Sequence, residues 1–116
     1  MRLLKRDAFM ALSPGYLYCK GKPWAFEQLL FKGDTLHAAD GHAVDWYSID
    51  FCWPDGNDSG EADDTLILDI MLETGESRAM RVSQCRDGCF DDDDVFMVFE
   101  QDDLLKVRSM IDEALK

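Results

Sequence analysis

The chain has 116 residues, of which 47% are hydrophobic and 11% aromatic, and its formal net charge is −12 at pH 7. This length predicts a single domain, and the aromatic content excludes a disordered acidic tail. The acidic balance disfavours a nucleic-acid-binding protein, because phosphate contacts need a basic surface.

The first half of the chain predicts one short helix and then three strands. Residues 5–12 favour a helix that ends at Ser13-Pro14-Gly15. Residues 25–32 are compatible with a helix or a strand, and Lys32-Gly33-Asp34 favours the strand because it has the composition of a hairpin turn. Strands are therefore predicted at residues 16–20, 26–32 and 44–53.

A loop and a helix are predicted next. Residues 54–60 are rich in Gly, Asp and Asn, which is typical of a loop. Asp63 or Asp64 can then cap a helix that runs to about Thr74 and ends at Gly75. The apolar residues between them also fit strand alternation, but the helix is preferred.

The last part of the chain predicts two strands and a helix. We expect a short strand at residues 79–85, a turn at Arg86-Asp87-Gly88 and a strand at residues 95–99. A C-terminal helix with Asp102 as its N-cap follows, since acids are favoured in the first turn. Its apolar stripe consists of Leu104, Val107, Ile111, Ala114 and Leu115.

This order of elements predicts the α+β class, with residues 1–116 forming a single acidic domain. The helices and strands do not alternate regularly, which favours a small, mainly antiparallel sheet with about three helices covering one face. We expect the C-terminal helix to pack on that sheet through Leu104, Ile111 and Leu115.

The acidic residues are concentrated in the second half, where residues 51–116 hold 18 of the 24 Asp and Glu residues and six of the 12 Lys and Arg residues. So many unpaired carboxylates repel one another, and neutralising residues 91–94 to Asn is expected to stabilise the isolated protein. The candidate partner-binding acidic surface consists of Asp58, Glu61, Asp63, Asp91, Asp92, Asp93, Asp94, Glu100, Asp102 and Asp103.

Two acidic segments are candidate metal sites. Residues 55–61 (DGNDSGE) resemble the first half of a calcium-binding EF-hand loop, but Leu66 stands where the pattern needs a bidentate Glu, and no helix is predicted before the loop. In an extended chain, only two carboxylates of the run at residues 91–94 would converge. We therefore predict no metal ion and no cofactor.

The cysteines and histidines give no clear site. Cys85 and Cys89 lack the two-residue spacing of a zinc knuckle or redox pair, and His37 and His42 lie in a predicted loop. Cys19 and Cys52 are expected to be small core residues. Because no signal peptide or membrane span is expected, we predict reduced thiols and a cytoplasmic location.

No catalytic constellation is present in the sequence. It contains no nucleophile elbow, no phosphate-binding Gly loop and no recognisable Cys-His signature. An aromatic group is compatible with either a recognition surface or the core of a small sheet, and consists of Trp46, Tyr47, Phe51 and Trp53.

Two segments are similar to small proteins from bacteriophage and prophage genomes. They are residues 1–20 (MRLLKRDAFMALSPGYLYCK) and residues 86–100 (RDGCFDDDDVFMVFE). The resemblance implies a protein in the cytoplasm of an infected or lysogenic bacterium. It implies no activity and no functional residues, because this group of proteins is uncharacterised.

These observations favour a non-enzymatic accessory protein that binds another protein. A sharper form is an inhibitor whose acidic face imitates nucleic acid and occupies a basic host protein, which requires the acids to lie on one face. The alternatives are a small metal-binding domain or an enzyme that uses the clustered carboxylates, and a metal site requires the acids to converge on one point.

Overall fold

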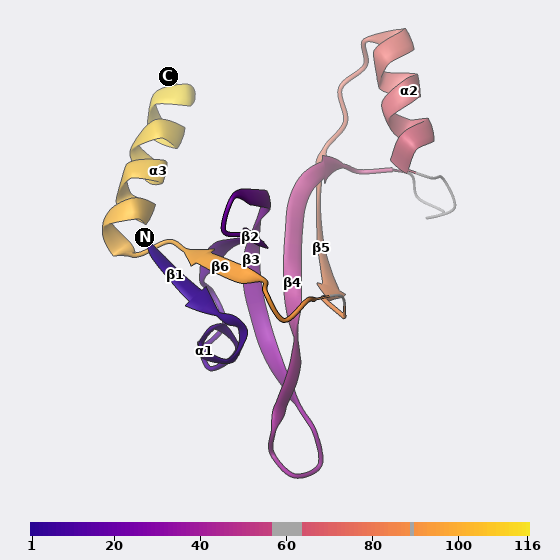
Figure 1. The fold of residues 1–116 in the computed structure, drawn as a ribbon. Helices are drawn as coiled ribbons and strands as arrows, with labels where there is room; N and C mark the ends of the chain where they lie inside the picture. The colour runs from indigo at the N-terminus through magenta and orange to yellow at the C-terminus, as the bar shows by residue number, and fades with distance from the viewer. Residues whose placement is uncertain (57–63, 89) are drawn as a thin grey trace.

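The computed structural model describes residues 1–56, 64–88 and 90–116. In this part of the chain, one six-stranded antiparallel sheet is accompanied by three helices (Figure 1), which confirms the predicted α+β class. The strands are β1 (Arg2–Lys5), β2 (Leu17–Lys22), β3 (Ala25–His37), β4 (Ala43–Pro54), β5 (Met80–Arg86) and β6 (Val95–Val98). The helices are α1 (Arg6–Met10), α2 (Asp64–Thr74) and α3 (Gln101–Ala114).

Strand β1 is an edge strand that the sequence analysis did not predict. The strand order is β1-β6-β2-β3-β4-β5, so the first and last strands of the chain pair with each other, with Leu4 opposite Phe96. The segment is too short and too basic to show an alternating pattern. Its conformation is set by pairing with β6, a strand about 90 residues away in the sequence.

The predicted hairpin turn at Lys32-Gly33-Asp34 is wrong, because β3 continues to His37 and the turn lies at residues 38–42. Lys32 pairs with Ser48 and Thr35 pairs with Trp46, so β3 has one extra residue between these pairs. This is a β-bulge. A Cβ atom at Gly33 would lie 3.0 Å from Tyr47 Cβ, so glycine accommodates the close approach of β4 at the bulge.

Helix α2 confirms the sequence prediction. It runs from Asp64 to Thr74, and Gly75 follows it with a φ of 70°. The Gly75 amide donates a hydrogen bond to Met71 O at 2.9 Å, which closes the helix end. Glycine is favoured there because it adopts this left-handed conformation without strain.

The core lies between α1 and one face of the sheet. Phe9 of α1 stacks on Phe96, with ring centroids 4.3 Å apart, and meets the edge of Trp46 at 5.3 Å. Trp46 is fully buried, so this member of the aromatic group is a core residue. The buried cluster consists of Phe9, Met10, Tyr18, Leu30, Trp46, Phe96 and Val98.

The prediction that α3 packs on the sheet is wrong. No residue of α3 is buried, and Leu115, just after the helix, is 80% exposed. Figure 1 shows that α2 and α3 both stand away from the sheet. The radius of gyration is accordingly 16.6 Å, against roughly 13 Å for a compact chain of this length. Of the three helices described, only α1 covers the sheet.

Lys32 is a fully buried base on the same face as the core. Its Nζ donates to Gly33 O at 3.1 Å and to Thr35 Oγ1 at 2.7 Å. The Thr35 hydroxyl in turn donates to Met10 O at 2.7 Å, so this network links the bulge to α1. Burial lowers the pKa of Lys32, and the nearby Asp34 charge offsets this only in part.

Replacing Lys32 with Met should flatten the dependence of stability on alkaline pH. Because the pKa of Lys32 is lowered by folding, the unfolded chain binds more protons as the pH approaches the ordinary value of 10.5, and wild-type stability should rise with pH there. Each unit of pKa depression corresponds to about 1.4 kcal/mol, or roughly 6 °C in thermal midpoint. Thermal midpoints of both proteins from neutral to alkaline pH would check this, with Lys5→Met as the exposed control. Parallel curves for wild type and Lys32→Met would contradict it.

Candidate functional site

The acidic run at residues 91–94 surrounds the side chain of Lys22. Lys22 Nζ lies 2.9 Å from Asp91 Oδ2, 2.6 Å from Asp93 Oδ1 and 2.8 Å from Asp94 Oδ1. The fourth acid, Asp92, pairs with Arg6 at 3.4 Å. All four aspartates therefore meet bases from the first half of the chain, and we call this group the Lys22 cluster.

The geometry of the Lys22 cluster follows from the pairing of β2 with β6. Gly21 is opposite Val95, so Lys22 at the end of β2 lies beside the residues that precede β6. The Asp94 amide donates to Asp91 O at 3.1 Å, and the Asp91 amide donates to Asp94 Oδ2 at 2.8 Å. These two bonds fold residues 91–94 into a turn, which brings three carboxylates together.

The expectation that only two of these carboxylates would converge is wrong, because the segment is a turn and not an extended strand. One carboxylate oxygen from each of Asp91, Asp93 and Asp94 lies within 4.8 Å of the others. Burial raises the pKa of Asp94, but its hydrogen bonds with Lys22 and the Asp91 amide outweigh this and lower it overall. The Lys22 ammonium is thus the counter-ion of these three carboxylates. A metal ion would have to displace it, which makes the metal-binding alternative less favourable.

Glu100 and Asp103 cap the start of α3. The Glu100 side chain accepts a hydrogen bond from the Asp103 amide, and the Glu100 amide donates to Asp103 Oδ2 at 2.9 Å. This is a reciprocal capping box. The N-cap is therefore Glu100 and not Asp102, which lies exposed in the first turn.

The described acids do not form one continuous face. The Lys22 cluster precedes β6 and the capping acids of α3 follow it, so the two groups lie at opposite ends of this strand. The predicted surface residues Asp58, Glu61 and Asp63 lie outside the described residues, as does most of the EF-hand-like segment. A strand, β4, precedes that segment in the position where an EF-hand has a helix.

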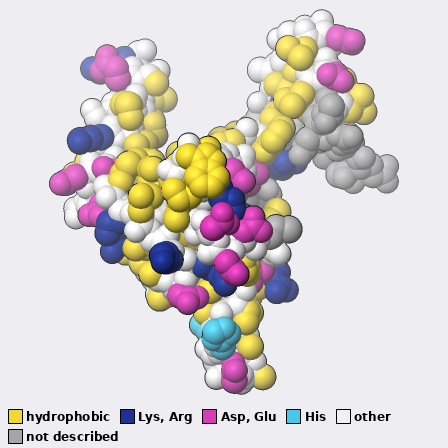
Figure 2. Space-filling model, in the orientation of Figure 1, with side chains coloured by type: hydrophobic (Ala, Val, Ile, Leu, Met, Phe, Trp, Pro, Cys, Tyr) yellow, Lys and Arg dark blue, Asp and Glu magenta, His cyan; other side chains and the backbone are white. Residues whose placement is uncertain are grey.

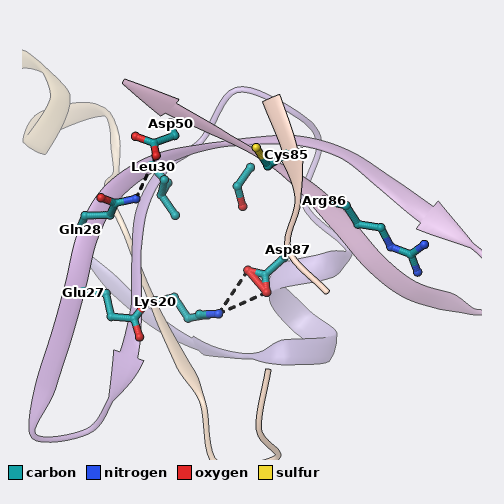
Figure 3. Close-up of a pocket in the computed structure, with 9 residues that line it drawn as sticks. Lys20, Glu27, Gln28, Leu30, Asp50, Cys85, Arg86 and Asp87 are labelled. Atoms are coloured by element: carbon teal, nitrogen blue, oxygen red, sulfur yellow. Dashed lines mark hydrogen bonds and ion pairs between the residues drawn. The ribbon is translucent and has the colours of Figure 1, made fainter. Parts of the chain in front are cut away.

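A pocket of about 390 Å³ opens on the sheet beside the core (Figure 3). Lys20 Nζ crosses it to Asp87, at 3.2 Å from Oδ1 and 3.3 Å from Oδ2. Gln28 Nε2 donates to Asp50 Oδ2 at 3.4 Å on another wall. The lining residues are Lys20, Glu27, Gln28, Leu30, Ser48, Asp50, Cys85, Arg86 and Asp87. Of these, the sequence indicated only Cys85 as a possible ligand and Arg86 and Asp87 as part of a turn, and it did not predict a pocket.

Hydrogen bonds join the pocket to the core. Trp46 Nε1 donates to Tyr18 OH at 3.1 Å, and Tyr18 OH lies 2.6 Å from Ser48 Oγ on the pocket wall. Burial raises the pKa of Tyr18, which keeps the phenol neutral. Ser48 is therefore bonded to a neutral phenol and not to a base, so this arrangement lacks the contact that activates a serine nucleophile.

Asp45 holds the turn that forms the pocket rim. Its buried carboxylate accepts hydrogen bonds from the amides of Trp46 and Gly88, at 2.8 Å and 3.1 Å, and from Arg86 Nε. Burial raises the pKa of Asp45, but these bonds together lower it. This rim could not be predicted from the sequence, because Asp45 and the turn residue Gly88 that it binds are 43 residues apart in the chain.

The described cysteines are free thiols that do not lie in the core. Cys52 and Cys85 are exposed and Cys19 is half-buried, so the prediction that Cys19 and Cys52 are core residues is wrong. Cys19 pairs with Leu29 and Met97 on the sheet face opposite α1. His37 ends β3 and His42 lies in the following turn, whereas Cys85 belongs to β5 and Cys89 lies outside the described residues.

No family model, curated protein or solved structure matches this chain. Among the described helices, none is long and apolar enough to span a membrane. The similarity to phage and prophage proteins and the cytoplasmic location therefore stay predictions from the sequence.

Proposed function

We propose that this chain is a non-enzymatic protein-binding protein that holds its partner through helix α2. The single observation that carries the proposal is that α2 is an apolar helix without cover on most of its surface. Leu72 is 83% exposed, and Leu66 and Leu68 are exposed beside it. Figure 2 shows hydrophobic side chains along both projecting helices.

The composition of α2 is that of a helix that is normally buried. At 100° per residue its apolar residues cover about two thirds of the circumference, and so wide an apolar face is typical of a helix in a protein interior or against a partner. Ile67 is buried, so one side of α2 contacts the rest of the chain, while the leucines point elsewhere. An exposed apolar helix of this kind suits binding in a groove on another protein.

The charges of α2 define the partner further. Asp69 and Glu73 are exposed acids on the helix, and α2 contains no Lys or Arg. With a net charge of −12, the chain attracts cationic surfaces. The partner is therefore a protein with an apolar groove and basic residues at its rim.

The nucleic-acid-mimicry version of this function is weaker than the α2 version. Mimicry by residues 91–94 requires free carboxylates on one face, whereas these acids pair with Lys22 and Arg6. The enzyme alternative is also weaker, since Lys20 and Asp87 in the described pocket are paired with each other. A phage or prophage origin would make the partner a bacterial host protein.

Affinity capture from a bacterial lysate tests this function. The immobilised full chain should retain a basic protein, and the Leu72→Ser variant should retain at least about tenfold less of it. Leu115→Ser is a matched control, because Leu115 is also a leucine beyond the sheet and is 80% exposed. Retention should fall partly when NaCl rises from about 0.05 M to 0.5 M, since salt screens the charges but not the apolar contact.

Two results would exclude the proposal. One is equal capture by wild type and Leu72→Ser, which would place the binding surface elsewhere. The other is the loss of capture in Leu115→Ser with retention in Leu72→Ser, which would assign the partner to the C-terminal helix.

A further inference from the structure

The face of the sheet opposite α1 is largely apolar, and no described helix lies over most of it, although Leu17, opposite Phe31, is buried there. Register pairs place Phe31 beside Ile49, and Cys19 between Leu29 and Met97. Phe31 and Phe51 are in ring contact at 5.5 Å, and Phe31 is 36% exposed. We call this the open face, and it consists of Cys19, Leu29, Phe31, Ile49, Phe51 and Met97, all of which keep part of their surface accessible.

Helix α3 carries an apolar stripe that is equally uncovered. At 100° per residue six apolar side chains gather on one side of α3, with Leu105 outside this group, and Ile111 in the stripe is 55% exposed. Lys106, Ser109 and Glu113 lie on the other side. The stripe consists of Leu104, Val107, Met110, Ile111, Ala114 and Leu115.

The stripe of α3 cannot reach the open face of its own chain. Only Phe99 and Glu100 separate β6 from α3, and the Phe99 amide is fixed to Leu17 O at 3.0 Å. Glu100 is held by the capping box and by an ion pair with Arg2 at 3.3 Å. These contacts direct α3 away from the sheet, so within the described residues both apolar surfaces stay accessible to another molecule.

We infer that two copies of the chain associate by each laying α3 on the open face of the other. When one chain carries both a surface and the surface that fits it, two copies can pair by two-fold symmetry. The contact between α3 and the open face then occurs twice in the dimer. The 14 residues of α3 are about 21 Å long, which is enough to cross the roughly 14 Å between the axes of β6 and β4. The six residues of the stripe and the six of the open face give twelve mostly apolar side chains per copy for the centre of this contact.

Because the chain is acidic, its affinity for a second copy should depend on salt in the opposite direction from its affinity for a cationic partner. Two chains of charge −12 repel each other, and added salt screens the repulsion. The dimer should therefore tighten as NaCl rises. This inference does not depend on the proposed role of α2, because it concerns α3 and the purified chain alone.

Sedimentation equilibrium of the purified full chain tests the inference. Between about 1 and 100 μM the mass should rise from 13.3 kDa to twice that value, at lower concentrations in high salt. Ile111→Asp on the stripe and Phe31→Asp on the open face should each weaken the association at least about tenfold. Ser109→Asp, which adds the same charge to the other side of α3, should leave it unchanged. A wild-type chain that stays at 13.3 kDa throughout would overturn the inference.

Mixing the two weakened variants distinguishes helix exchange from pairing of α3 with α3. The Ile111→Asp chain keeps an intact open face, and the Phe31→Asp chain keeps an intact α3. Their mixture should form a dimer through one of the two helix–sheet contacts. A mixture that stays monomeric, or a Phe31→Asp variant that still dimerises, would overturn the inference.

Alkylation of Cys19 provides a measurement that does not need a variant of the sheet, should Phe31→Asp fail to fold. Cys19 lies on the open face, whereas Cys85 is exposed on β5. At dimer-forming concentrations, iodoacetamide should modify Cys19 at least about tenfold more slowly in wild type than in Ile111→Asp, with Cys85 as the internal reference. Equal rates at Cys19 in both proteins would overturn the inference.

Discussion

Replacing Phe9 with alanine should lower the free energy of unfolding by about 3–5 kcal/mol. Phe9 is fully buried, with its ring centroid 4.3 Å from that of Phe96 and 4.5 Å from that of Tyr18. It is the main contact through which α1 covers the core, and α1 has only five residues. No other described helix can move in to fill the cavity, because α2 and α3 stand away from the sheet.

Urea denaturation followed by circular dichroism would measure this effect. Since small domains have a total stability of about 5–15 kcal/mol, the variant should lose about a fifth of it or more. Leu72→Ala is the control, and its change should stay within about 0.5 kcal/mol because Leu72 is 83% exposed in the isolated chain. A loss below about 1 kcal/mol for Phe9→Ala would mean that α1 is dispensable for the core.

The elements that could be predicted from the sequence are those with a local signal. Helix α2 has an acidic start and Gly75 at its end, and β6 is a run of apolar residues. Both are found as predicted. The bulge at Gly33 could not be distinguished from a turn, because glycine next to aspartate is common to both. Only the long-range pairing of β3 with β4 decides between them.

The position of α3 shows why a correct helix can be wrongly placed. Its amphipathic pattern correctly predicts a helix with a side that needs cover, but the pattern does not say which surface covers it. The link through Phe99 and Glu100 fixes the direction of the helix. That information resides in the hydrogen bond to Leu17, a residue more than 80 positions earlier, and not in the helix itself.

The site was predicted only in part, for a related reason. The acidic run at residues 91–94 is evident in the sequence, but its partners, Lys22 and Arg6, lie in the first half of the chain. Counting charges within the second half therefore overestimates the unpaired acids. The pocket around Lys20 and Asp87 has no sequence signature, since its residues come from β2, β3, β4 and the end of β5.

The Lys22 cluster reverses the expected effect of neutralising its acids. Asp94→Asn should lower the free energy of unfolding by about 1–3 kcal/mol, because hydrogen bonds to a charged group are lost at a buried position. This corresponds to roughly 4 °C per kcal/mol in thermal midpoint. Asp92→Asn is the matched control within the same run: Asp92 is fully exposed and has one long contact with Arg6, so its thermal midpoint should change little.

The pH dependence of stability in the two variants shows whether the loss in Asp94→Asn comes from the charge of Asp94. Folding lowers the pKa of Asp94, so its charge stabilises the protein above the ordinary aspartate value of 3.8, and this stabilisation is lost as the pH falls through the folded value. The difference in thermal midpoint between wild type and Asp94→Asn should therefore be full at pH 7 and shrink below pH 3.8. If Asp94→Asn were instead more stable than wild type at pH 7, repulsion among the four acids would outweigh their pairing with Lys22. Residues 91–94 would then again be a candidate binding surface for a cationic partner, as predicted from the sequence.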